Sequence, residues 1–246
     1  MEIEGRVAVV TGAAIGTGRA IALALAAAGA DVVASDIDEE GGAETVARAP
    51  GRMSFVRADM TAPDDIRRLI AAAKPQILVN NAGGGGHIPP HFPDAGAEQW
   101  GATLDLNLRG PMLATQLALE HMLPAGAGAV VNVASTAALG SEPYQSPEYA
   151  AAKAGLIRFT SALGGRRERT GVRVNCVVPD WIATERALAE LQAMTPEQRA
   201  AAPVPRPPDE IADAVAAFVR DDRLCGRVLV MWPGEPPRLL DPGLRV

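Results

Sequence analysis

The chain has 246 residues, 48% of them hydrophobic, and a formal net charge of -6. This length suits one large α/β domain or two small ones. The acidic balance and the lack of long Lys or Arg runs argue against a nucleic-acid partner. Two cysteines indicate a reducing compartment. The acidic N-terminus does not look like a signal peptide, and the longest apolar run, 20–30, is too short for a membrane span, so we expect a cytoplasmic protein with no membrane partner.

The first candidate site is a glycine-rich turn between a predicted strand and a predicted helix. The β-rich run 6–10 comes before Gly12, Gly16 and Gly18, and an Ala/Leu-rich helix follows them to about Gly29. A turn of this kind lets backbone amides approach a phosphate group at the positive end of a helix. The pattern therefore indicates a nucleotide site.

An acidic residue at the end of the next predicted strand, 31–35, indicates which nucleotide. Asp36 follows the glycine turn by about the distance at which a carboxylate binds the adenosine ribose hydroxyls of NAD. A carboxylate there would repel the 2′-phosphate of NADP. Ala13, Ala14 and Ile37 bring no cation to offset that repulsion, so the sequence predicts NAD, with NADP less favoured.

Alternating strand and helix patterns continue along the chain and predict a single domain with one doubly wound parallel sheet. Further strands are expected at 53–57, 76–79, 129–134, 172–178 and 227–231, helices at 64–73, 98–121, 147–169 and 209–220, and a proline-rich loop at 196–208. Ligands of such sheets bind beyond the carboxyl ends of the strands. The residues expected on that rim are Asp36, Asp59, Asn81, Ser135 and Pro179.

The stretch 146–153 predicts the chemistry. Ser146 is expected to cap a helix, Pro147 suits its first position, and Tyr149 and Lys153 then lie one turn apart on one face. A lysine ammonium favours the phenolate and lowers the pKa of a neighbouring tyrosine, so the pair can exchange a proton with an alcohol or carbonyl oxygen. The alternative is an ordinary surface tyrosine and lysine on an alanine-rich helix.

Taken together, these motifs resemble the short-chain dehydrogenase/reductase family over nearly the whole chain, from Val7 to Met231. The motifs are Thr11-Gly12-x-x-x-Gly16-x-Gly18, Asn80-Asn81-Ala82-Gly83, Asn107, Ser135, Tyr149-x-x-x-Lys153 and Pro179 to Thr184. The resemblance implies a Rossmann fold with a parallel sheet of about seven strands. It also implies assembly as a homotetramer or homodimer.

The resemblance implies four catalytic residues. Tyr149 would be the general acid/base, and Lys153 would lower its pKa and hold the nicotinamide ribose. Ser135 would hydrogen-bond the substrate oxygen, and Asn107 would hold a water that links Lys153 to solvent. On the residues alone, Asn107 could instead satisfy backbone groups, and Ser135 could be a turn serine.

The resemblance also implies a cofactor site that begins at the glycine turn and ends after the strand at 172–178. Its residues would be Gly12, Ile15, Gly16, Gly18, Asp36, Ile37, Asp59, Met60, Asn81, Ala82, Gly83, Tyr149, Lys153, Pro179, Ile182 and Thr184. On its residue type alone, Asn81 could simply satisfy backbone groups near a strand end. The three histidines are not spaced as metal ligands, and no metal is expected.

The sequence departs from the family pattern at several positions. Asp180 stands where the family has glycine after the proline, and Gly164-Gly165 weaken the Tyr149 helix. The Asp180 carboxylate is expected either to face the substrate pocket or to favour the oxidised nicotinamide; the alternative is a solvent-facing turn residue. The tail 232–246, expected to be irregular, lacks the family's aspartate and paired glycines.

The function predicted is NAD-dependent interconversion of a secondary alcohol and a ketone. The substrate would be a small hydroxyl or carbonyl compound, held by the loops 84–93 and 139–145 and the stretch after Thr184. The segment 185–208 is expected to form a mobile helical lid. The alternatives are an NAD-dependent epimerase or dehydratase, and a nucleotide-binding regulatory module that has lost catalysis.

Overall fold

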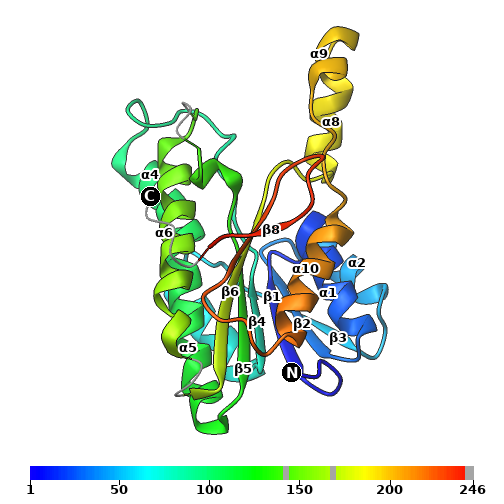
Figure 1. Cartoon of the computed structure of the whole chain (residues 1–246), viewed down its shortest axis with the longest axis vertical. Helices are drawn as coiled ribbons and strands as arrows, with labels where there is room; N and C mark the ends of the chain where they lie inside the picture. The colour runs from blue at the N-terminus through cyan, green and yellow to red at the C-terminus, as the bar shows by residue number, and fades with distance from the viewer. Residues whose placement is uncertain (141–143, 167–169, 242–246) are drawn as a thin grey trace.

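A computed structural model describes residues 1–140, 144–166 and 170–241 and contains one eight-stranded sheet (Figure 1). The strand order is β3-β2-β1-β4-β5-β6-β7-β8. The strands are β1 (Val7–Thr11), β2 (Asp31–Asp36), β3 (Met53–Arg57), β4 (Ile77–Asn80), β5 (Gly128–Val133), β6 (Val172–Pro179), β7 (Val228–Met231) and β8 (Arg238–Leu239). All neighbouring pairs are parallel except β7 and β8. The predicted parallel α/β sheet is confirmed, with one added antiparallel strand.

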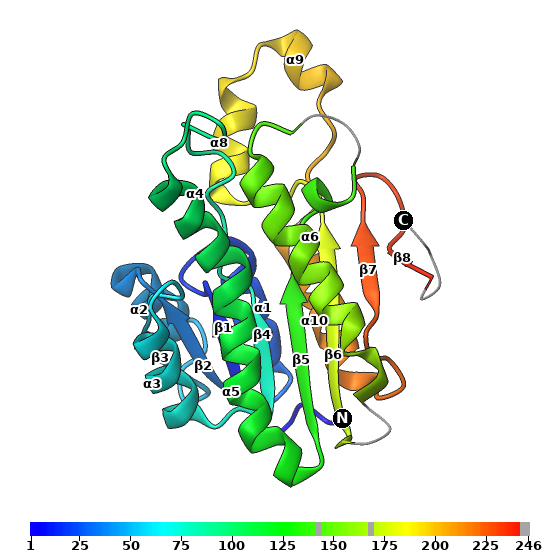
Figure 2. The ribbon, with the colours of Figure 1, turned by 90° about the vertical axis from the view of Figure 1, so that its left-hand side faces the viewer.

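Helices cover both faces of the sheet, as Figures 1 and 2 show. One face carries α1 (Gly16–Ala27), α2 (Glu39–Ala47) and α10 (Pro208–Arg220), and the other carries α3 (Pro63–Ala73), α4 (Ala97–Leu104), α5 (Gly110–Ala125) and α6 (Pro147–Ala162). Two further helices, α8 (Glu185–Ala193) and α9 (Pro196–Ala201), project beyond one end of the sheet. Across the described ranges, no helix has the length and apolar character needed to cross a membrane.

The core lies on both sides of the central strands. Every residue of β4, β5 and β6 is buried, as expected for parallel strands with helices on both faces. Alternation along β1 places Val10 in the cluster under α1 and α10, and Val9 in the cluster under α3 and α5. The rigid centre of the sheet therefore fixes where each strand ends.

Several helix boundaries differ from the prediction. The single helix expected at 98–121 is instead α4 and α5 joined by a widened π-helical turn, Asp105–Arg109, which ends directly before Gly110. Helix α6 ends at Ala162 rather than near residue 169, because Gly164 and Gly165 follow in a 3₁₀ turn. Residues 167–169 lie outside the described ranges.

Three elements differ from the predicted loops or were not predicted. Helix α2 was not predicted, although Asp38 caps it by accepting a hydrogen bond from Gly41 N. The loop expected at 196–208 is wrong at its start, because Thr195 and Gln198 form a capping box for α9. The tail expected to be irregular contains β8, which pairs with β7.

A buried chain of polar side chains joins the sheet to the helices α5 and α6. Asn80 Nδ2 donates to Asn132 Oδ1 at 2.8 Å and to Thr115 Oγ1 at 3.0 Å. Asn132 Nδ2 in turn donates to Thr160 Oγ1 at 2.9 Å. These side chains come from β4, β5, α5 and α6 and are at most 1% exposed. The network therefore fixes α6, which carries Tyr149, against the sheet.

Replacing Asn132 with alanine should destabilise the fold by about 2–4 kcal/mol, because it opens a cavity and removes two buried hydrogen bonds. Urea unfolding followed by circular dichroism measures this loss. Ser54→Ala, at an exposed position of β3, is the control and should change the free energy of unfolding by less than about 0.5 kcal/mol. Equal stability of the two variants would contradict a structural role for the network.

Candidate active site

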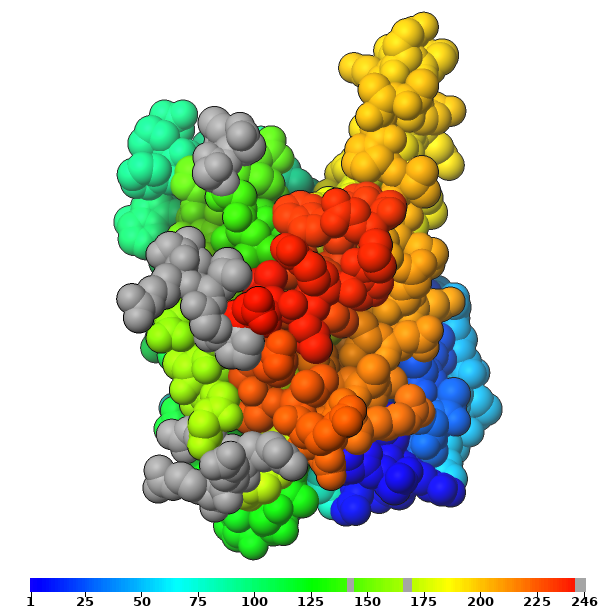
Figure 3. Space-filling view, viewed as in Figure 1, coloured from blue at the N-terminus to red at the C-terminus, as the bar shows by residue number. Residues whose placement is uncertain are grey.

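The predicted rim residues lie at one edge of the sheet. Asp36 and Pro179 end β2 and β6, Asn81 directly follows β4, and Asp59 and Ser135 come just after β3 and β5. Because these strands are parallel, their carboxyl ends meet at the edge from which α8 and α9 project (Figure 2). The space-filling view shows this end of the molecule hollowed between two columns, one of them formed by α8 and α9 (Figure 3).

The glycine turn is held tightly between β1 and α1. A β-carbon at Gly18 would lie 1.8 Å from the carbonyl oxygen of Gly12, so only glycine fits there, and Gly16 has a φ of +52°. Asn81 Nδ2 donates to the carbonyls of Thr11 and Gly12 at 3.0 Å each. In this structure the Asn81 side chain therefore satisfies backbone groups, which is the alternative that its residue type left open.

Thr11 was part of the predicted motif but had no role of its own. Its Oγ1 accepts hydrogen bonds from Asn81 N at 3.1 Å and Ala82 N at 3.0 Å. The same hydroxyl donates to Val79 O at 3.3 Å. Thr11 therefore joins the glycine turn to the Asn81-Ala82-Gly83 loop within the candidate cofactor site.

The N-terminus of α1 presents backbone amides to the rim. Its N-cap residue, Ile15, makes no side-chain capping bond, and its first turn has no acidic residue. The Ile15 side chain itself is 54% exposed. Amides at the positive end of a helix form a site for a phosphate group, and here no side chain of the first turn competes for them.

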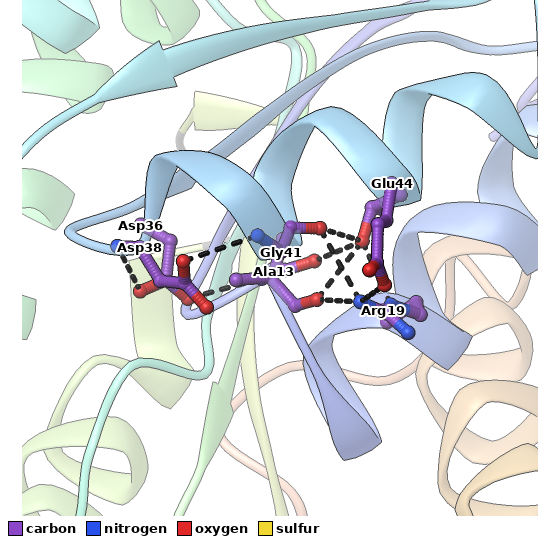
Figure 4. A network of polar contacts seen from close by, with 8 residues as sticks. Ala13, Arg19, Asp36, Asp38, Gly41 and Glu44 are labelled. Atoms are coloured by element: carbon purple, nitrogen blue, oxygen red, sulfur yellow. Dashed lines mark hydrogen bonds and ion pairs between the residues drawn. The ribbon is translucent and has the colours of Figure 1, made fainter.

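Asp36 is fixed beside the glycine turn (Figure 4). Its Oδ2 accepts a hydrogen bond from Ala14 N at 3.0 Å, and its Oδ1 accepts from Ile37 N at 2.8 Å and Asp38 N at 3.2 Å. The Ile37 side chain, 60% exposed, stands next to it. The carboxylate predicted to meet the adenosine ribose thus lies where β2 ends, next to the start of α1.

Arg19, a cation not considered in the sequence analysis, bonds the same backbone segment as Asp36, at Ala14. The donors of its guanidinium group already have partners. Arg19 is buried, and its guanidinium donates to the carbonyls of Ala14 and Gly41 and to Thr45 Oγ1. It also pairs with Glu44 at 3.1 Å (Figure 4). Its charge is therefore directed into the protein, away from the rim.

The adenine side of the predicted site is formed after β3. Asp59 Oδ1 accepts from both the amide and the hydroxyl of Thr61 at 2.8 Å. Asp59 N donates to Asp65 Oδ2 at 3.0 Å. Met60 is 4% exposed, so its side chain packs in the core, and the backbone of this turn is what faces the rim.

Three of the predicted catalytic residues meet around a glycine loop after β4. A β-carbon at Gly83 would lie 2.8 Å from Asn107 Oδ1 and 2.9 Å from Lys153 Nζ. One at Gly86 would lie 2.9 Å from Cγ of the Tyr149 ring. The absence of side chains at these two glycines therefore lets Asn107, Lys153 and Tyr149 approach one another.

Lys153 is a buried cation. Its side chain projects from α6 towards β5, where Nζ donates to Val133 O at 3.0 Å, and the residue is only 3% exposed. Burial penalises the charged form and lowers the pKa of Lys153 to about 8. Near neutral pH this ammonium is therefore poised to lose its proton more easily than an ordinary lysine.

The expected effect of Lys153 on Tyr149 differs in this structure. Burial of the phenol raises the pKa of Tyr149 to about 12, although its hydrogen bond with Ser135 acts in the opposite direction. Lys153 Nζ lies 5.7 Å from the centre of the Tyr149 ring and bonds the Val133 carbonyl. The prediction that Lys153 lowers the pKa of Tyr149 is thus not met, because desolvation of the phenolate dominates.

Asn107 sits in the π-helical turn and is fully buried. Its Oδ1 accepts from Gly84 N at 3.0 Å, and its Nδ2 donates to Gly84 O at 2.8 Å and Thr103 O at 2.9 Å. The side chain therefore satisfies backbone groups of the glycine loop, while its oxygen also borders Gly83 and Lys153. π-Helical turns often occur at functional sites because they redirect one side chain.

Ser135, just after β5, lies close enough to Tyr149 for its hydroxyl to oppose the rise in the pKa of the phenol. Its extended backbone begins a 3₁₀ turn, and its Oγ accepts a hydrogen bond from Ala137 N at 3.2 Å. Thr136, the next residue, donates to Asp180 Oδ2 at 2.6 Å. One oxygen of the Asp180 carboxylate is therefore bonded to the turn that follows β5.

The start of α6 is held by an unpredicted pair. His91 Nδ1 lies 3.0 Å from Glu148 Oε1, and Phe92 N donates to Glu148 Oε2 at 3.3 Å. Ser146 makes no side-chain cap bond, so its expected capping role is wrong. The Glu148 carboxylate instead bonds His91 and Phe92, and so holds the loop before α4 against the start of α6, next to Tyr149.

The loop after β6 closes the site on the side of α8. Thr184 caps α8 through a hydrogen bond from Ala187 N, and its methyl group would lie 3.1 Å from a β-carbon at Gly16. Ile182 pairs with Arg206 in an isolated parallel bridge. The loop therefore runs from the end of β6 to the glycine turn and spans the predicted cofactor site.

Another aromatic ring lies against Tyr149. The Tyr144 and Tyr149 rings stack with centroids 6.2 Å apart and an interplanar angle of 28°. Tyr144 is 41% exposed, so its ring forms part of the wall of the cleft. Residues 141–143 of the predicted substrate loop lie outside the described ranges.

These features define a Rossmann-like α/β domain with a tyrosine, a lysine, a serine and an asparagine at the carboxyl edge of its sheet. A family model described as short chain dehydrogenase matches residues 6–194. The cis-4-hydroxycyclohexanecarboxylate dehydrogenase of Sinomonas cyclohexanicum is 38% identical over 229 residues, 88% of this chain and 90% of the relative. An uncharacterized oxidoreductase of Thermotoga maritima is 34% identical over 239 residues, 91% of each chain.

A solved structure of similar fold supports the same family. Actinorhodin polyketide ketoreductase, solved as a variant with NADPH, has a TM-score of 0.82 and 29% identity and covers 94% of this chain and 97% of that one. The chain belongs to the short-chain dehydrogenase family, whose members are oxidoreductases that act on hydroxyl or carbonyl groups and use nicotinamide cofactors.

Lys153→Met should make the protein more stable at neutral pH, by about 1–2 kcal/mol, because removal of the buried charge outweighs the loss of its one hydrogen bond to Val133 O. The unfolded lysine keeps its proton up to its ordinary pKa of 10.5, whereas the folded one loses it near pH 8. Wild-type stability therefore rises with pH across this window, and the advantage of the variant should shrink.

Urea unfolding of both proteins at neutral pH and between pH 8 and 10.5 tests this window. Lys74→Met removes the other lysine of the chain, which is exposed, and shows the effect of losing a surface charge. A stability difference between Lys153→Met and the wild type that stays constant across the window would contradict the lowered pKa.

Proposed function

We propose that the protein is an NAD-dependent oxidoreductase that interconverts a secondary alcohol and a ketone. The observation that carries this proposal is the meeting of Tyr149, Lys153 and Asn107 around Gly83 and Gly86. Ser135 lies close to Tyr149 and favours a lower pKa of its phenol. A non-catalytic nucleotide-binding module would have no need for this costly arrangement of a buried lysine beside a partly buried phenol.

The residues present fit a nicotinamide dinucleotide. The uncapped amides of α1 and the glycine turn suit a pyrophosphate. Asp36 suits the adenosine ribose, and the turn at Asp59 and Met60 the adenine. On the other side, Ala82 and Gly83 with Pro179, Ile182 and Thr184 border the place for the nicotinamide half. When bound, the cofactor supplies or accepts the hydride.

The protein residues handle the proton. Tyr149 would donate a proton to the ketone oxygen in reduction and accept one from the alcohol in oxidation. Ser135 would hold the same oxygen through its hydroxyl. Lys153, with its lowered pKa, would exchange the proton with solvent. Asn107 would hold the water that links Lys153 to solvent. Because Tyr149 is partly buried and Lys153 is buried, these bonds would form with reduced access to bulk water, which makes each of them stronger.

Preference for NAD is supported by the charges at the rim. Asp36 presents a carboxylate beside the glycine turn, while Arg19 is bonded to carbonyls and Glu44 inside the protein. Arg57, at the end of β3, pairs with Glu39 at 3.6 Å. A 2′-phosphate would therefore meet the Asp36 carboxylate, and the cation opposite Asp36 in the sheet register, Arg57, already pairs with Glu39.

The substrate proposed is a small to medium hydroxyl or carbonyl compound. The name of the Sinomonas relative makes cis-4-hydroxycyclohexanecarboxylate a suitable first alcohol to test. Helices α8 and α9 stand beside the cleft and are proposed to act as its lid. Assembly as a homodimer or homotetramer and a cytoplasmic location stay predictions.

Titration with NADH and NADPH, followed by nicotinamide fluorescence, tests the cofactor. The wild type should bind NADH at least about fivefold more tightly than NADPH, because one repelled charge pair costs roughly 1 kcal/mol or more. Asp36→Ala should reduce the difference between the affinities for NADH and NADPH. Asp31→Ala, at the far end of β2, should leave that difference unchanged. Tighter binding of NADPH by the wild type would overturn the NAD assignment.

Tyr149→Phe tests catalysis. It should keep NADH affinity but lower kcat for alcohol oxidation by about a hundredfold or more, because it removes the acid/base hydroxyl. Tyr144→Phe, which preserves the stacked ring, should keep most of the turnover. If Tyr149→Phe turned over as well as the wild type, the proposed proton relay would be wrong.

A further inference from the structure

Asp180 links two loops of the candidate active site. It directly follows β6, where the family pattern has glycine, and its Oδ2 accepts a hydrogen bond from Thr136 Oγ1 at 2.6 Å. Its Oδ1 accepts from Trp181 N at 2.7 Å. Both distances are short, as expected when the acceptor carries a full negative charge.

The carboxylate is itself held in place. Asp180 N donates to Met231 O at 3.2 Å, so its backbone is fixed to the end of β7. The bond from Trp181 N then restricts rotation of the Asp180 side chain. Thr136 is 7% exposed, so its hydroxyl has little access to water as a substitute partner. Asp180 is thus a rigid acceptor for a nearly buried donor.

The donor belongs to the turn that orients Ser135. Thr136 begins the 3₁₀ turn Thr136–Ala138, for which Ser135 is the N-cap. Ser135 Oγ accepts from Ala137 N, and Ser135 O accepts from Ala138 N at 3.1 Å. A bond that fixes Thr136 therefore fixes the backbone next to Ser135 and the direction of its hydroxyl.

We propose that Asp180 is a positioning residue, which acts through Thr136 to hold the Ser135 hydroxyl in the direction of Tyr149. The inference rests on the proposed function for the role of Ser135. It adds a role to the earlier expectations for Asp180, which were that its carboxylate faces the substrate pocket, favours the oxidised nicotinamide or faces solvent in a turn. Strands β5 and β6 are neighbours in the sheet. The Asp180–Thr136 hydrogen bond therefore joins the two loops that follow these strands, which are not consecutive in the chain.

Two substitutions remove the bond from either side. Asp180→Ala removes the acceptor, and Thr136→Val removes the donor while it keeps the shape of the side chain. Each should lower kcat by about tenfold to a hundredfold, because a small misplacement of a catalytic group costs this much. NADH affinity should change by less than about twofold, since an effect on orientation is felt in turnover.

The double variant should be no worse than the poorer single variant, because both changes break the same bond. Asp180→Asn keeps a neutral acceptor and should recover part of the lost turnover. Ser161→Ala, which removes a hydroxyl bond to Ile157 O in α6, is the control and should leave kcat unchanged.

Amide hydrogen exchange provides a measurement that needs no turnover. The amides of Ala137 and Ala138 should exchange faster in Asp180→Ala and in Thr136→Val, because their acceptors are both on Ser135. If no alcohol were oxidised by the wild type, the proposed function would fail, while this exchange result would still decide the positioning role.

Three outcomes would overturn the inference. The first is unchanged exchange in both variants. The second is a loss of NADH affinity that matches the loss of kcat, which would assign Asp180 to cofactor binding. The third is an additive loss in the double variant, which would show that Asp180 and Thr136 act independently.

Discussion

A lysine ammonium taken almost completely out of water is the constraint around which this active site is arranged. Desolvating Lys153 costs free energy, and its only direct protein acceptor among the described hydrogen bonds is the Val133 carbonyl at the end of β5. The ammonium can be placed there because α6 packs closely on the sheet and because Gly83 leaves space beside Asn107. Desolvation of the Tyr149 phenol raises its pKa as well. The pKa values of both residues therefore depend on how closely α6 packs on the sheet.

The π-helical turn follows from the same constraint. Asn107 must reach Gly84 and the space beside Lys153 while the long helix continues on both sides of it. A regular helix would direct this side chain differently, and the widened turn at Asp105–Arg109 allows it to point inward. The close approach of Gly110 to Met60 O, 2.3 Å from where a β-carbon would lie, shows why glycine ends the turn.

The sequence was sufficient for the features that depend on local pattern. Strand positions, the parallel sheet and the rim at Asp36 and Ser135 were predicted because buried runs and strand ends have clear periodic signals. The sequence was not sufficient for features that depend on contacts between residues far apart in the chain. The Asp180–Thr136 bond joins residues 44 positions apart, and the raised pKa of Tyr149 depends on burial, which the Tyr149-x-x-x-Lys153 spacing does not contain.

The two departures from the family pattern near the end of the chain meet in space. Asp180 N is bonded to Met231 O, directly before the altered tail. Arg206 N donates to Trp181 O, and the Arg206 guanidinium donates to the carbonyls of Trp232 and Glu235. The loop after β6, the segment after α9 and the tail are therefore one hydrogen-bonded unit. A carboxylate in place of glycine is tolerated at the rim because its partners on both sides, Thr136 and this unit, fix where its charge points.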